Sequence, residues 1–387
     1  MALEIKFINN LNQINPSDWN ALLTSNTPFV RYEFLRLLEE TGAVSDIENN
    51  TENENGWYAH HLCIFEEGKL VAALPLYKKT HWFGEYVFDW AWDEAYSRYG
   101  LNYYPKLTAA IPFTPVTGPR LLTRRPITQE FLADITQCLE QHCLEEGFSS
   151  CHILFPQKPV SDSLTKLHWQ QRKSVQFHWF NDNYKSFEDF LAKFASRKRK
   201  NVKKERDKIK QANIEIIRLH GEAINHKHMA FFYRCYQQTY AKRSGHIGYL
   251  SEVFFTGLLK HFKENLLLVV AIKNNNAVAS ALYFHDCEHL YGRYWGSLVD
   301  IDALHFECCY YQGIEFCIEQ GLKRFNPGTQ GEHKIQRGFT PIDCYSNHWL
   351  KDKAFHQAIT HFIQEETAHL VEYKQQATNL LPFKRDA

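Results

Sequence analysis

The pattern of apolar and polar residues predicts the same order of elements at two places in the chain. In the first copy, two apolar runs within 57–80 flank the turn Glu66–Lys69, which predicts a β-hairpin. Apolar residues at helical spacing follow over 127–146, and Gly147 ends that helix before an apolar strand over 148–156. The first copy therefore reads as hairpin, helix and strand.

The second copy lies nearer the C-terminus. Apolar runs within 265–286 flank Asn274–Asn276 and predict a hairpin. A strongly apolar helix is expected over 304–320, ended by Gly321, and a strand over Leu322–Phe325. The duplication indicates two related α/β lobes, each a mixed sheet with helices packed on it. Chance is the alternative, because hairpin, helix and strand is a common order.

A strongly basic segment lies between the two copies. Apolar residues at helical spacing from Phe187 to Ile209 predict one amphipathic helix. From Lys193 to Lys210 there are ten Lys or Arg against two acids, a local net charge of +8. Like charges one turn apart oppose the helix, so an anionic partner is favoured over a solvated face. The candidate phosphate-binding cations are Arg197, Lys198 and Arg199.

Acidic and aromatic residues are interleaved over 81–107. The alternation over 86–93 predicts a strand with aromatic rings on one face and acids on the other. Acids beside indole rings suit a pocket for an amino or ammonium group, through ion pairing and cation–π attraction. The alternative is an aromatic core strand with its acids in water. The candidate acceptor-binding residues are Asp89, Trp90, Trp92, Asp93 and, from a later segment, Tyr294.

The predicted loop Asn326–Pro341 combines glycines with four titratable side chains. The glycines permit positive φ angles and close approach of the backbone to a ligand. The titratable side chains supply candidate bases and anion-binding cations. Loops concentrate functional residues, so we expect chemistry here, with a solvated charged loop as the alternative. The residues concerned are Gly328, Gly331, Gly338, Glu332, His333, Lys334 and Arg337.

The composition is that of an ordinary intracellular protein. The length of 387 residues favours two domains, and the 44 basic and 44 acidic residues cancel. The chain has no signal-peptide pattern and no run of about 18 apolar residues, so a cytoplasmic protein without a membrane span is expected. The ten cysteines form no CxxC pair, and the cluster His305–Cys309 lacks the partner cysteines of a zinc deaminase. We therefore expect buried free thiols and no metal site.

Four longer blocks carry a resemblance to a known family. They are GEYVFDWAWDEAY from Gly84, YYPKLTAAIPFTPVTGPRLL from Tyr103, YGRYWG from Tyr291 and FNPGTQGEHKIQRGFTP from Phe325. These blocks resemble the bacterial FemAB-like predicted N-acyltransferases, which are connected with peptidoglycan biosynthesis or recognition and belong to the wider GNAT-fold acyltransferases. The likeness extends from Pro28 to the helix after Trp349. It implies an enzyme that transfers an acyl or aminoacyl group to an amine.

The resemblance also implies the fold and its division. We expect an α/β (α+β) protein of two tandem GNAT-like lobes, each a mixed sheet flanked by helices. The N-terminal lobe is expected over 1–180, the basic helix or linker over 181–215, and the C-terminal lobe with a C-terminal helix over 216–387.

The family pattern leaves the donor open. Fem-type ligases take an aminoacyl group from tRNA, whereas ordinary GNAT enzymes use acyl-coenzyme A. The usual coenzyme A loop, Gln or Arg followed by x-x-Gly-x-Gly/Ala, is absent, and Arg243–Gly248 has the wrong spacing. A long helical-hairpin arm between lobes is absent too. Because only one basic helix stands out in a neutral chain, acyl-coenzyme A is expected as co-substrate, with tRNA as the alternative and no permanently bound cofactor.

Amide formation from an activated ester or thioester requires an aligned amine, a base and stabilisation of the oxyanion. The expected base is Glu332 or His333. Glu307 is a further candidate, because a carboxylate on an apolar helix is either paired or functional. Tyr294 and Tyr310 are the candidates for protonating the leaving group. Donor phosphate is assigned to Lys334, Arg337, Gly331, Gly338 and the cations Arg197, Lys198 and Arg199.

The sequence therefore predicts an N-acyltransferase whose partners are a small-molecule amine acceptor and an acyl donor. Two alternatives remain: a non-catalytic protein that keeps the GNAT fold, and a tRNA-binding or lipid-anion-binding module built on the basic helix. The sequence defines neither the acceptor amine nor the oligomeric state.

Overall fold

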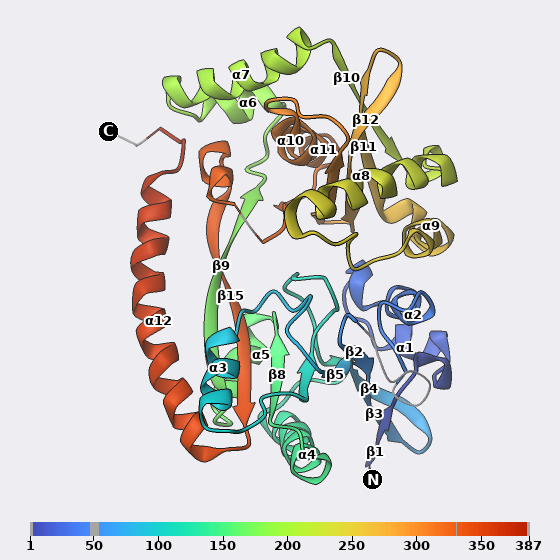
Figure 1. The fold of residues 1–387 in the computed structure, drawn as a ribbon, viewed down its shortest axis with the longest axis vertical. Coiled ribbons are helices and arrows are strands. Elements are labelled where there is room, and N and C mark those ends of the chain that lie inside the picture. The colour runs from blue at the N-terminus through green and yellow to red at the C-terminus, as the bar shows by residue number, and fades with distance from the viewer. Residues whose placement is uncertain (1–2, 47–53, 330, 385–387) are drawn as a thin grey trace. The chain divides into compact units, whose positions relative to one another are not determined.

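The computed structural model describes residues 3–46, 54–329 and 331–384, which divide into two compact units (Figure 1). The first unit contains residues 1–175 and 343–372, and the second contains 176–342 and 373–387. The basic segment 181–215 thus belongs to the second unit. Residues 343–372, which the sequence-based boundaries placed in the C-terminal lobe, belong to the first.

Strands of the first unit form a four-stranded antiparallel arrangement, β1-β3-β4-β7, and a mixed arrangement, β15-β8-β6-β5-β2. In the mixed arrangement β6 and β8 run parallel, and the other observed pairs are antiparallel. The strands are β1 (Leu3–Ile8), β2 (Trp57–Ala59), β3 (His61–Glu66), β4 (Lys69–Leu74), β5 (Leu76–Lys79), β6 (Lys106–Ala109), β7 (Leu122–Thr123), β8 (Ser150–Leu154) and β15 (Thr340–Leu350).

Helices of the first unit cover these strands. The apolar face of α4, with Leu132, Ile135 and Leu139, packs against strand residues such as Leu107 and Cys151 in one buried core. Burying this face stabilises both the helix and the strands beneath it. The helices are α1 (Pro16–Ala21), α2 (Tyr32–Glu40), α3 (Trp90–Arg98), α4 (Gln129–Glu146), α5 (Lys158–Thr165), most of α12 (Lys353–Asn379), and the short 3-10 turns η1 (Leu11–Gln13) and η2 (Pro28–Val30).

The second unit contains the order β10-β11-β12-β13-β14-β9. Its strands are β9 (Gln170–Phe180), β10 (Ile214–His220), β11 (Leu266–Lys273), β12 (Asn276–His285), β13 (His289–Ser297) and β14 (Arg324–Asn326). Its helices are α6 (Phe187–Ala192), α7 (Ser196–Gln211), α8 (His226–Ser244), α9 (Glu252–His261), α10 (Leu304–Phe306), the π-helix η5 (Glu307–Tyr311), α11 (Gln312–Gln320), and the 3-10 turns η3 (Gly221–Ala223), η4 (Lys263–Asn265) and η6 (Glu332–Arg337).

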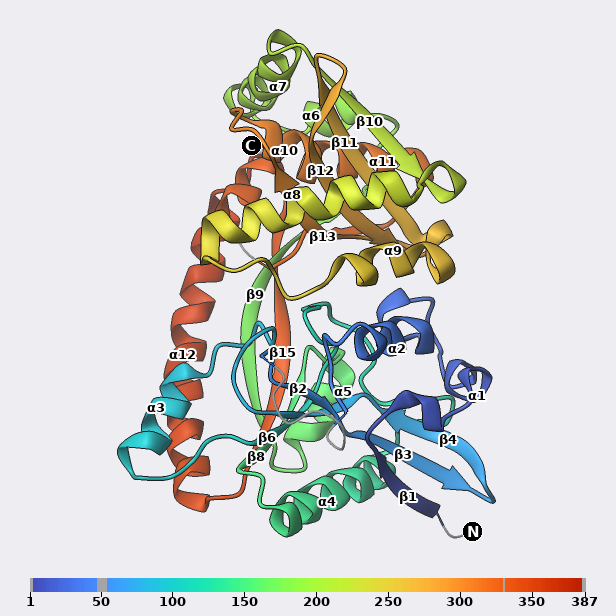
Figure 2. The same ribbon diagram turned by 45° about the vertical axis from the view of Figure 1, so that its right-hand side comes forward.

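Helices lie on both faces of the second unit's sheet (Figure 2). Neighbouring residues of β13 show this, because Tyr294 contacts Tyr236 of α8 while Trp295 contacts His305 of α10. Successive strand residues point to opposite faces. Gly296 allows α8 to pack closely, since a Cβ atom there would lie 2.0 Å from the carbonyl oxygen of Cys235. Within this unit, the α8 side and the α10 side of β13 are therefore separate environments.

Both predicted copies of hairpin, helix and strand are confirmed. In the first copy, β3 and β4 pair across Glu67 and Gly68, which both have positive φ, and α4 ends at Gly147 with φ 77°. In the second, β11 and β12 pair across Asn274 and Asn275, again with positive φ. The following helical run ends at Gly321 (φ 67°). Local turn and capping chemistry therefore defined these elements.

Two predicted elements are wrong. The alternating segment 86–93 is not a strand, because Tyr86 has φ 59° and α3 begins at Trp90. Its Asp89 side chain is buried, where it binds Lys106, instead of pointing to solvent.

The basic helix is also not continuous, since α6 and α7 are separated by residues 193–195. At this break the Ala195 N–H donates to the carbonyl of Pro382, and the Lys384 N–H donates to the carbonyl of Lys193. No helix among residues 3–46, 54–329 and 331–384 is both long and apolar enough to cross a membrane.

Candidate functional site

The loop predicted over 326–341 contains a short 3-10 helix, η6, that faces the π-helix η5 within the second unit. Tyr310 of the π-helix and His333 of η6 meet, with the hydroxyl oxygen 2.7 Å from the imidazole Nε2. The ring of His305 lies 5.8 Å from that of His333 and 5.2 Å from that of Tyr310, measured between centroids. We call Tyr310, His333, Lys334 and His305 the His333 cluster.

Special backbone conformations position this cluster. Gly331 precedes η6 with φ 110°, and a Cβ atom on it would lie 2.2 Å from the His333 ring. Only glycine therefore allows His333 to fold back at the start of η6. On the other side, the π-helix is a rare conformation that occurs often at functional sites. The Tyr283 hydroxyl donates a hydrogen bond to the carbonyl of Cys308 inside it.

His333 is an exposed residue whose imidazole has a lowered pKa. Partial burial, and then the positive charges of Arg337, Lys334 and Arg243, lower the pKa of His333 to about 4. The imidazole is therefore neutral near pH 7 and can accept a proton. Burial raises the pKa of the Tyr310 hydroxyl, so the tyrosine stays protonated. With Nε2 unprotonated, the Tyr310 hydroxyl donates to it.

Lys334 is a buried amine with a lowered pKa. Its side chain is almost fully buried, with 1% of the residue exposed, and Nζ donates to the carbonyl oxygen of Gly328 at 2.6 Å. Burial lowers its pKa to about 7. Among the residues that the structure describes, no carboxylate forms an ion pair with it. Lys334 can therefore exist as a neutral amine or as an ammonium group near neutral pH.

Arg337 holds η6 in place through contacts with neighbouring residues. Its guanidinium binds both oxygens of Glu205, at 2.6 and 3.2 Å, and donates to the carbonyl of His333 at 2.6 Å. It also lies 3.4 Å from the centre of the Phe306 ring. This bidentate, stacked geometry positions the backbone that carries His333.

The two candidate carboxylates lie in different surroundings from His333. Glu332 is exposed and accepts a hydrogen bond from the Tyr373 hydroxyl at 2.9 Å. Glu307 is buried and paired with Arg206, at 3.0 and 3.1 Å. A carboxylate on that helix was expected to be either paired or functional, and Glu307 is paired.

Residues predicted to bind the acceptor belong to two different environments. In the second unit, Tyr294 packs against α8, on the side of β13 opposite Trp295 and His305. In the first unit, Trp92 is buried against His348, whereas Trp90 is 51% exposed. Asp93 is partly buried, and burial and the Asp89 charge raise its pKa.

Asp89 is part of a buried ion cluster of the first unit. Lys106 Nζ lies 2.5 Å from Asp89 Oδ2 and 2.9 Å from Glu85 Oε2, and all three side chains are almost fully buried. Burial would raise the pKa of Asp89, but the Lys106 charge and hydrogen bonds from Lys106 and Tyr103 lower it below its usual value. Burial raises the pKa of Glu85 to about 7. Asp89 is thus the carboxylate that balances the charge of Lys106.

Three side chains around the His333 cluster were not predicted as site residues. His305 appeared only in a rejected zinc pattern, Arg243 only in a rejected coenzyme A pattern, and Trp295, which contacts His305, was not considered. Their positions depend on the register of β13 and on where α8 ends, which no local motif signals. Within the described residues, no group of three or more His, Cys, Asp or Glu side chains is placed to hold a metal ion.

The short strand β14 ends beside the longer β13. The parallel pair β13 and β14 is joined over only three residues, His289–Tyr291 with Arg324–Asn326, and β13 continues to Ser297 without β14. Trp295 lies on this continuation, where β13 pairs with β12. The cluster thus offers a neutral imidazole, a tyrosine hydroxyl and a buried amine within the second unit.

The chain was compared with known proteins. The model of the FemAB-like family, described as peptidoglycan biosynthesis/recognition, matches residues 10–385. No curated protein shows significant sequence similarity to the chain. Solved structures of similar fold include FemX, with 11% identity, a TM-score of 0.52 and coverage of 90% of this chain and 98% of that one. They also include a conserved protein of unknown function from Bacteroides thetaiotaomicron VPI-5482, with 12% identity, a TM-score of 0.50 and coverage of 90% of this chain and 100% of that one.

The family match covers almost the whole chain, and the two structural likenesses show the same mixed α/β fold, with sheets flanked by helices. The chain is a transferase of the acyltransferase type. It belongs to the FemAB-like family of peptidoglycan biosynthesis and recognition proteins.

Proposed function

We propose that the chain transfers an acyl or aminoacyl group from an activated donor to an amino group of a peptidoglycan-related acceptor, using the His333 cluster. The observation that carries this proposal is the contact between Tyr310 and the neutral imidazole of His333, beside the buried amine of Lys334. Family membership supports the reaction class. No metal or permanently bound cofactor enters the proposed chemistry, and acyl-coenzyme A would act as a co-substrate.

In the proposed mechanism, the acceptor nitrogen attacks the carbonyl carbon of the ester or thioester, and a tetrahedral oxyanion forms. The nitrogen then loses a proton to the Tyr310 oxygen while the Tyr310 proton passes to His333 Nε2. Collapse of the oxyanion breaks the bond to the donor oxygen or sulfur, and the proton returns through Tyr310 to this leaving group. A hydroxyl and an imidazole in hydrogen-bond contact can relay a proton in this way. Protonated Lys334 would stabilise the oxyanion.

The roles of the other predicted residues are proposed from their surroundings. Trp90 and Asp93 remain candidates for binding an acceptor ammonium group, because one is exposed and the other has no ion-pair partner in the described part of the chain. Asp89 is a weaker candidate, since Lys106 already balances its charge. Glu332 is an exposed alternative to His333 as base.

An aminoacyl-tRNA donor is a second candidate, which one specific observation favours. Six cations of α7 have no ion-pair partner in the part of the chain that the structure describes, although α7 is only 16 residues long. A row of free cations suits an extended phosphate backbone. The six are Arg197, Lys198, Arg199, Lys200, Lys204 and Lys210.

The direct test is a transfer assay with both donor classes. Purified protein would be incubated with a peptidoglycan-type peptide carrying a free amine and with either an acyl-coenzyme A mixture or charged bulk tRNA. Mass spectrometry would then detect the new amide. Amide formation from either donor, lost in the Tyr310→Phe variant, supports the proposal. Absence of amide with both donors, in protein shown to be folded, would contradict it.

A further inference from the structure

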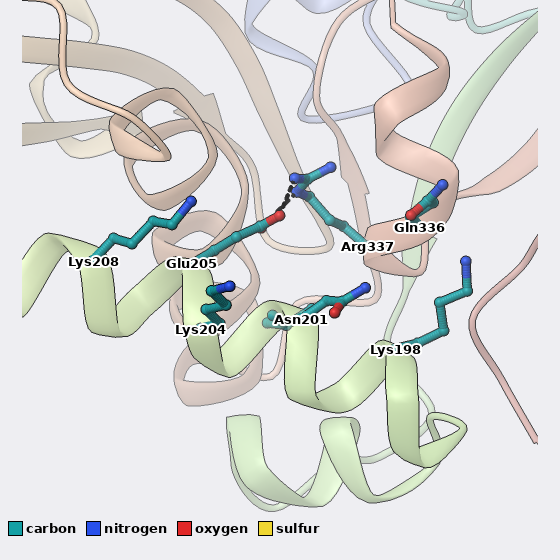
Figure 3. A pocket seen from close by; sticks show the side chains of 8 residues that line it. Lys198, Asn201, Lys204, Glu205, Lys208, Gln336 and Arg337 are labelled. Atoms are coloured by element: carbon teal, nitrogen blue, oxygen red, sulfur yellow. Dashed lines mark hydrogen bonds and ion pairs between the residues drawn. The ribbon is translucent and has the colours of Figure 1, made fainter.

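One face of α7 is turned toward η6 in the second unit. Lys198, Asn201, Glu205 and Lys208 follow each other at intervals of three or four residues, which places them on the same side of a helix. Together with Gln336 and Arg337 they line a pocket of about 200 Å³ (Figure 3). Val202 and Lys204 complete its lining. We call it the α7 pocket.

The charges that line the α7 pocket are unbalanced. Its single carboxylate, Glu205, is bound by Arg337 at 2.6 Å. Lys208 is bound by Asp302 at 2.5 Å, outside the lining. Lys198 and Lys204 have no ion pair with any described residue. The pocket therefore keeps two uncompensated positive charges.

Neutral hydrogen-bond donors add to this charge. The side-chain amides of Asn201 and Gln336 form no hydrogen bond with any other described residue. Each amide can donate two hydrogen bonds, and each lysine ammonium group three. A small pocket with so many free donors and no free carboxylate matches the four acceptor oxygens of a phosphate group.

Lys198 and Lys204 do not stabilise the helix α7 itself. Lys198 lies in the first turn of α7, where the helix dipole is unfavourable to positive charge, and that turn has no acidic residue. Lys204 is one turn from both Lys200 and Lys208, so like charges repel along the helix. Some α7 cations are balanced, as Arg206 is by Glu307 and Glu315. Lys198 and Lys204 are the two cations lining the pocket that have no ion pair with any described residue.

We propose that the α7 pocket binds one phosphate group of the acyl or aminoacyl donor, between Lys198, Lys204 and the amides of Asn201 and Gln336. The assignment to the donor rests on the proposed function. It is supported by continuity with the His333 cluster, because the Arg337 that lines the pocket donates to the carbonyl of His333. Residues 333 and 337 are about 8 Å apart along a 3-10 helix, so one donor molecule could contact both the pocket and the cluster.

The start of the helix after β13 is less suited to this task. Anions often bind where a glycine-rich loop leads into a helix N-terminus. Here the segment before α10 contains Asp300 and Asp302 and no glycine. Asp302 is paired with Lys208, whereas Asp300 has no ion pair with any described residue and repels a phosphate. The α7 pocket is therefore the better anchor for the donor.

Paired charge deletions on the same helix test the proposal. The double variant Lys198→Ala/Lys204→Ala removes the pocket's free cations, and Lys200→Ala/Lys210→Ala removes two free cations of α7 outside it. Isothermal titration calorimetry would measure binding of inorganic pyrophosphate, coenzyme A and bulk tRNA at 50 mM and 150 mM salt. We expect the pocket variant to lose about tenfold or more in pyrophosphate affinity, while the control variant changes little, because removed charge-assisted hydrogen bonds act at short range.

Competition of coenzyme A or tRNA with bound pyrophosphate would identify the source of the phosphate. Displacement of pyrophosphate by coenzyme A identifies a small donor, and displacement by tRNA identifies a nucleic acid; either supports the pocket. Equal losses in both double variants would show a diffuse contact along the helix and would overturn the proposal, as would no binding to the wild type. Amide formation without pyrophosphate binding would overturn the pocket and leave the proposed function standing. Pyrophosphate binding without amide formation would support the pocket and contradict the proposed function.

Discussion

At the scale of single residues, Lys334 is the side chain whose charge the fold disfavours most clearly within the candidate site. Its pKa is lowered to about 7 in the folded protein, against about 10.4 for an exposed lysine. The protonated form is therefore less stable in the folded state than in the unfolded state. The resulting penalty is full below about pH 7 and disappears as the pH rises through the unfolded pKa.

The variant Lys334→Met should remove this penalty. We expect its free energy of unfolding to exceed that of the wild type at pH 7, by up to about 4 kcal/mol, and the difference to shrink toward pH 10. Urea denaturation at the two pH values measures both quantities. A variant that is less stable at pH 7, by an amount independent of pH, would show that Lys334 is not a buried, destabilised cation.

Asp89 illustrates a residue whose predicted role changes when its partner is known. As a pocket acid it would affect acceptor binding, but it is buried against Lys106. Breaking such a pair leaves an uncompensated charge, so Asp89→Asn should lower the free energy of unfolding by about 3 kcal/mol. Asp93→Asn is the matched control, because Asp93 lacks an ion pair within the described residues. If both substitutions have equal and small effects on thermal unfolding, the buried pair is not a stabilising one.

At the scale of elements, η6 depends on the glycine that precedes it. Gly331→Ala introduces a strained φ angle and a clash with the His333 ring. We expect a loss of about 2 kcal/mol or more in the free energy of unfolding and a changed His333 imidazole signal in NMR spectra. Gly42→Ala is the control, since Gly42 has φ 74° but no atom within 4 Å of the added Cβ. A loss no greater than the control's would leave η6 independent of this close approach.

Elements were predictable from sequence wherever local chemistry sets them. The hairpins turn at Gly68 and Asn274–Asn275, and the helices end at Gly147 and Gly321, because these residues adopt positive φ easily. The strand predicted over 86–93 failed because Lys106, from another strand, draws Asp89 inward. Alternation of residue types alone could not reveal that contact.

The candidate site was predictable to a similar extent. The density of glycines and charges in 326–341 marked η6, and the apolar helix marked Tyr310. The contact of His305 with His333 and that of Trp295 with His305 could not be predicted, because they depend on the helix after β13 and on the register of β13. The commitment of Arg337 to Glu205 is likewise a tertiary contact.

At the scale of the whole molecule, distant parts of the chain complete one unit. Residues 373–387 belong to the second unit, where the Phe383 ring lies 5.4 Å from that of Phe194, at the break between α6 and α7. Phe383→Ala should loosen this contact and destabilise α7. We expect faster amide hydrogen exchange in α7, and unchanged exchange in α4 of the first unit. Unaltered exchange in α7 would mean that the C-terminal segment does not support it.

The central claim is that His333, and not its neighbour Glu332, accepts the proton during acyl transfer. The most direct measurement compares kcat/KM for His333→Gln, Glu332→Gln and His361→Gln, an exposed histidine of the first unit, with the transfer assay described above. We expect a loss of about 100-fold or more for His333→Gln only, with unchanged unfolding temperatures. A loss of that size in Glu332→Gln, with His333→Gln fully active, would contradict it.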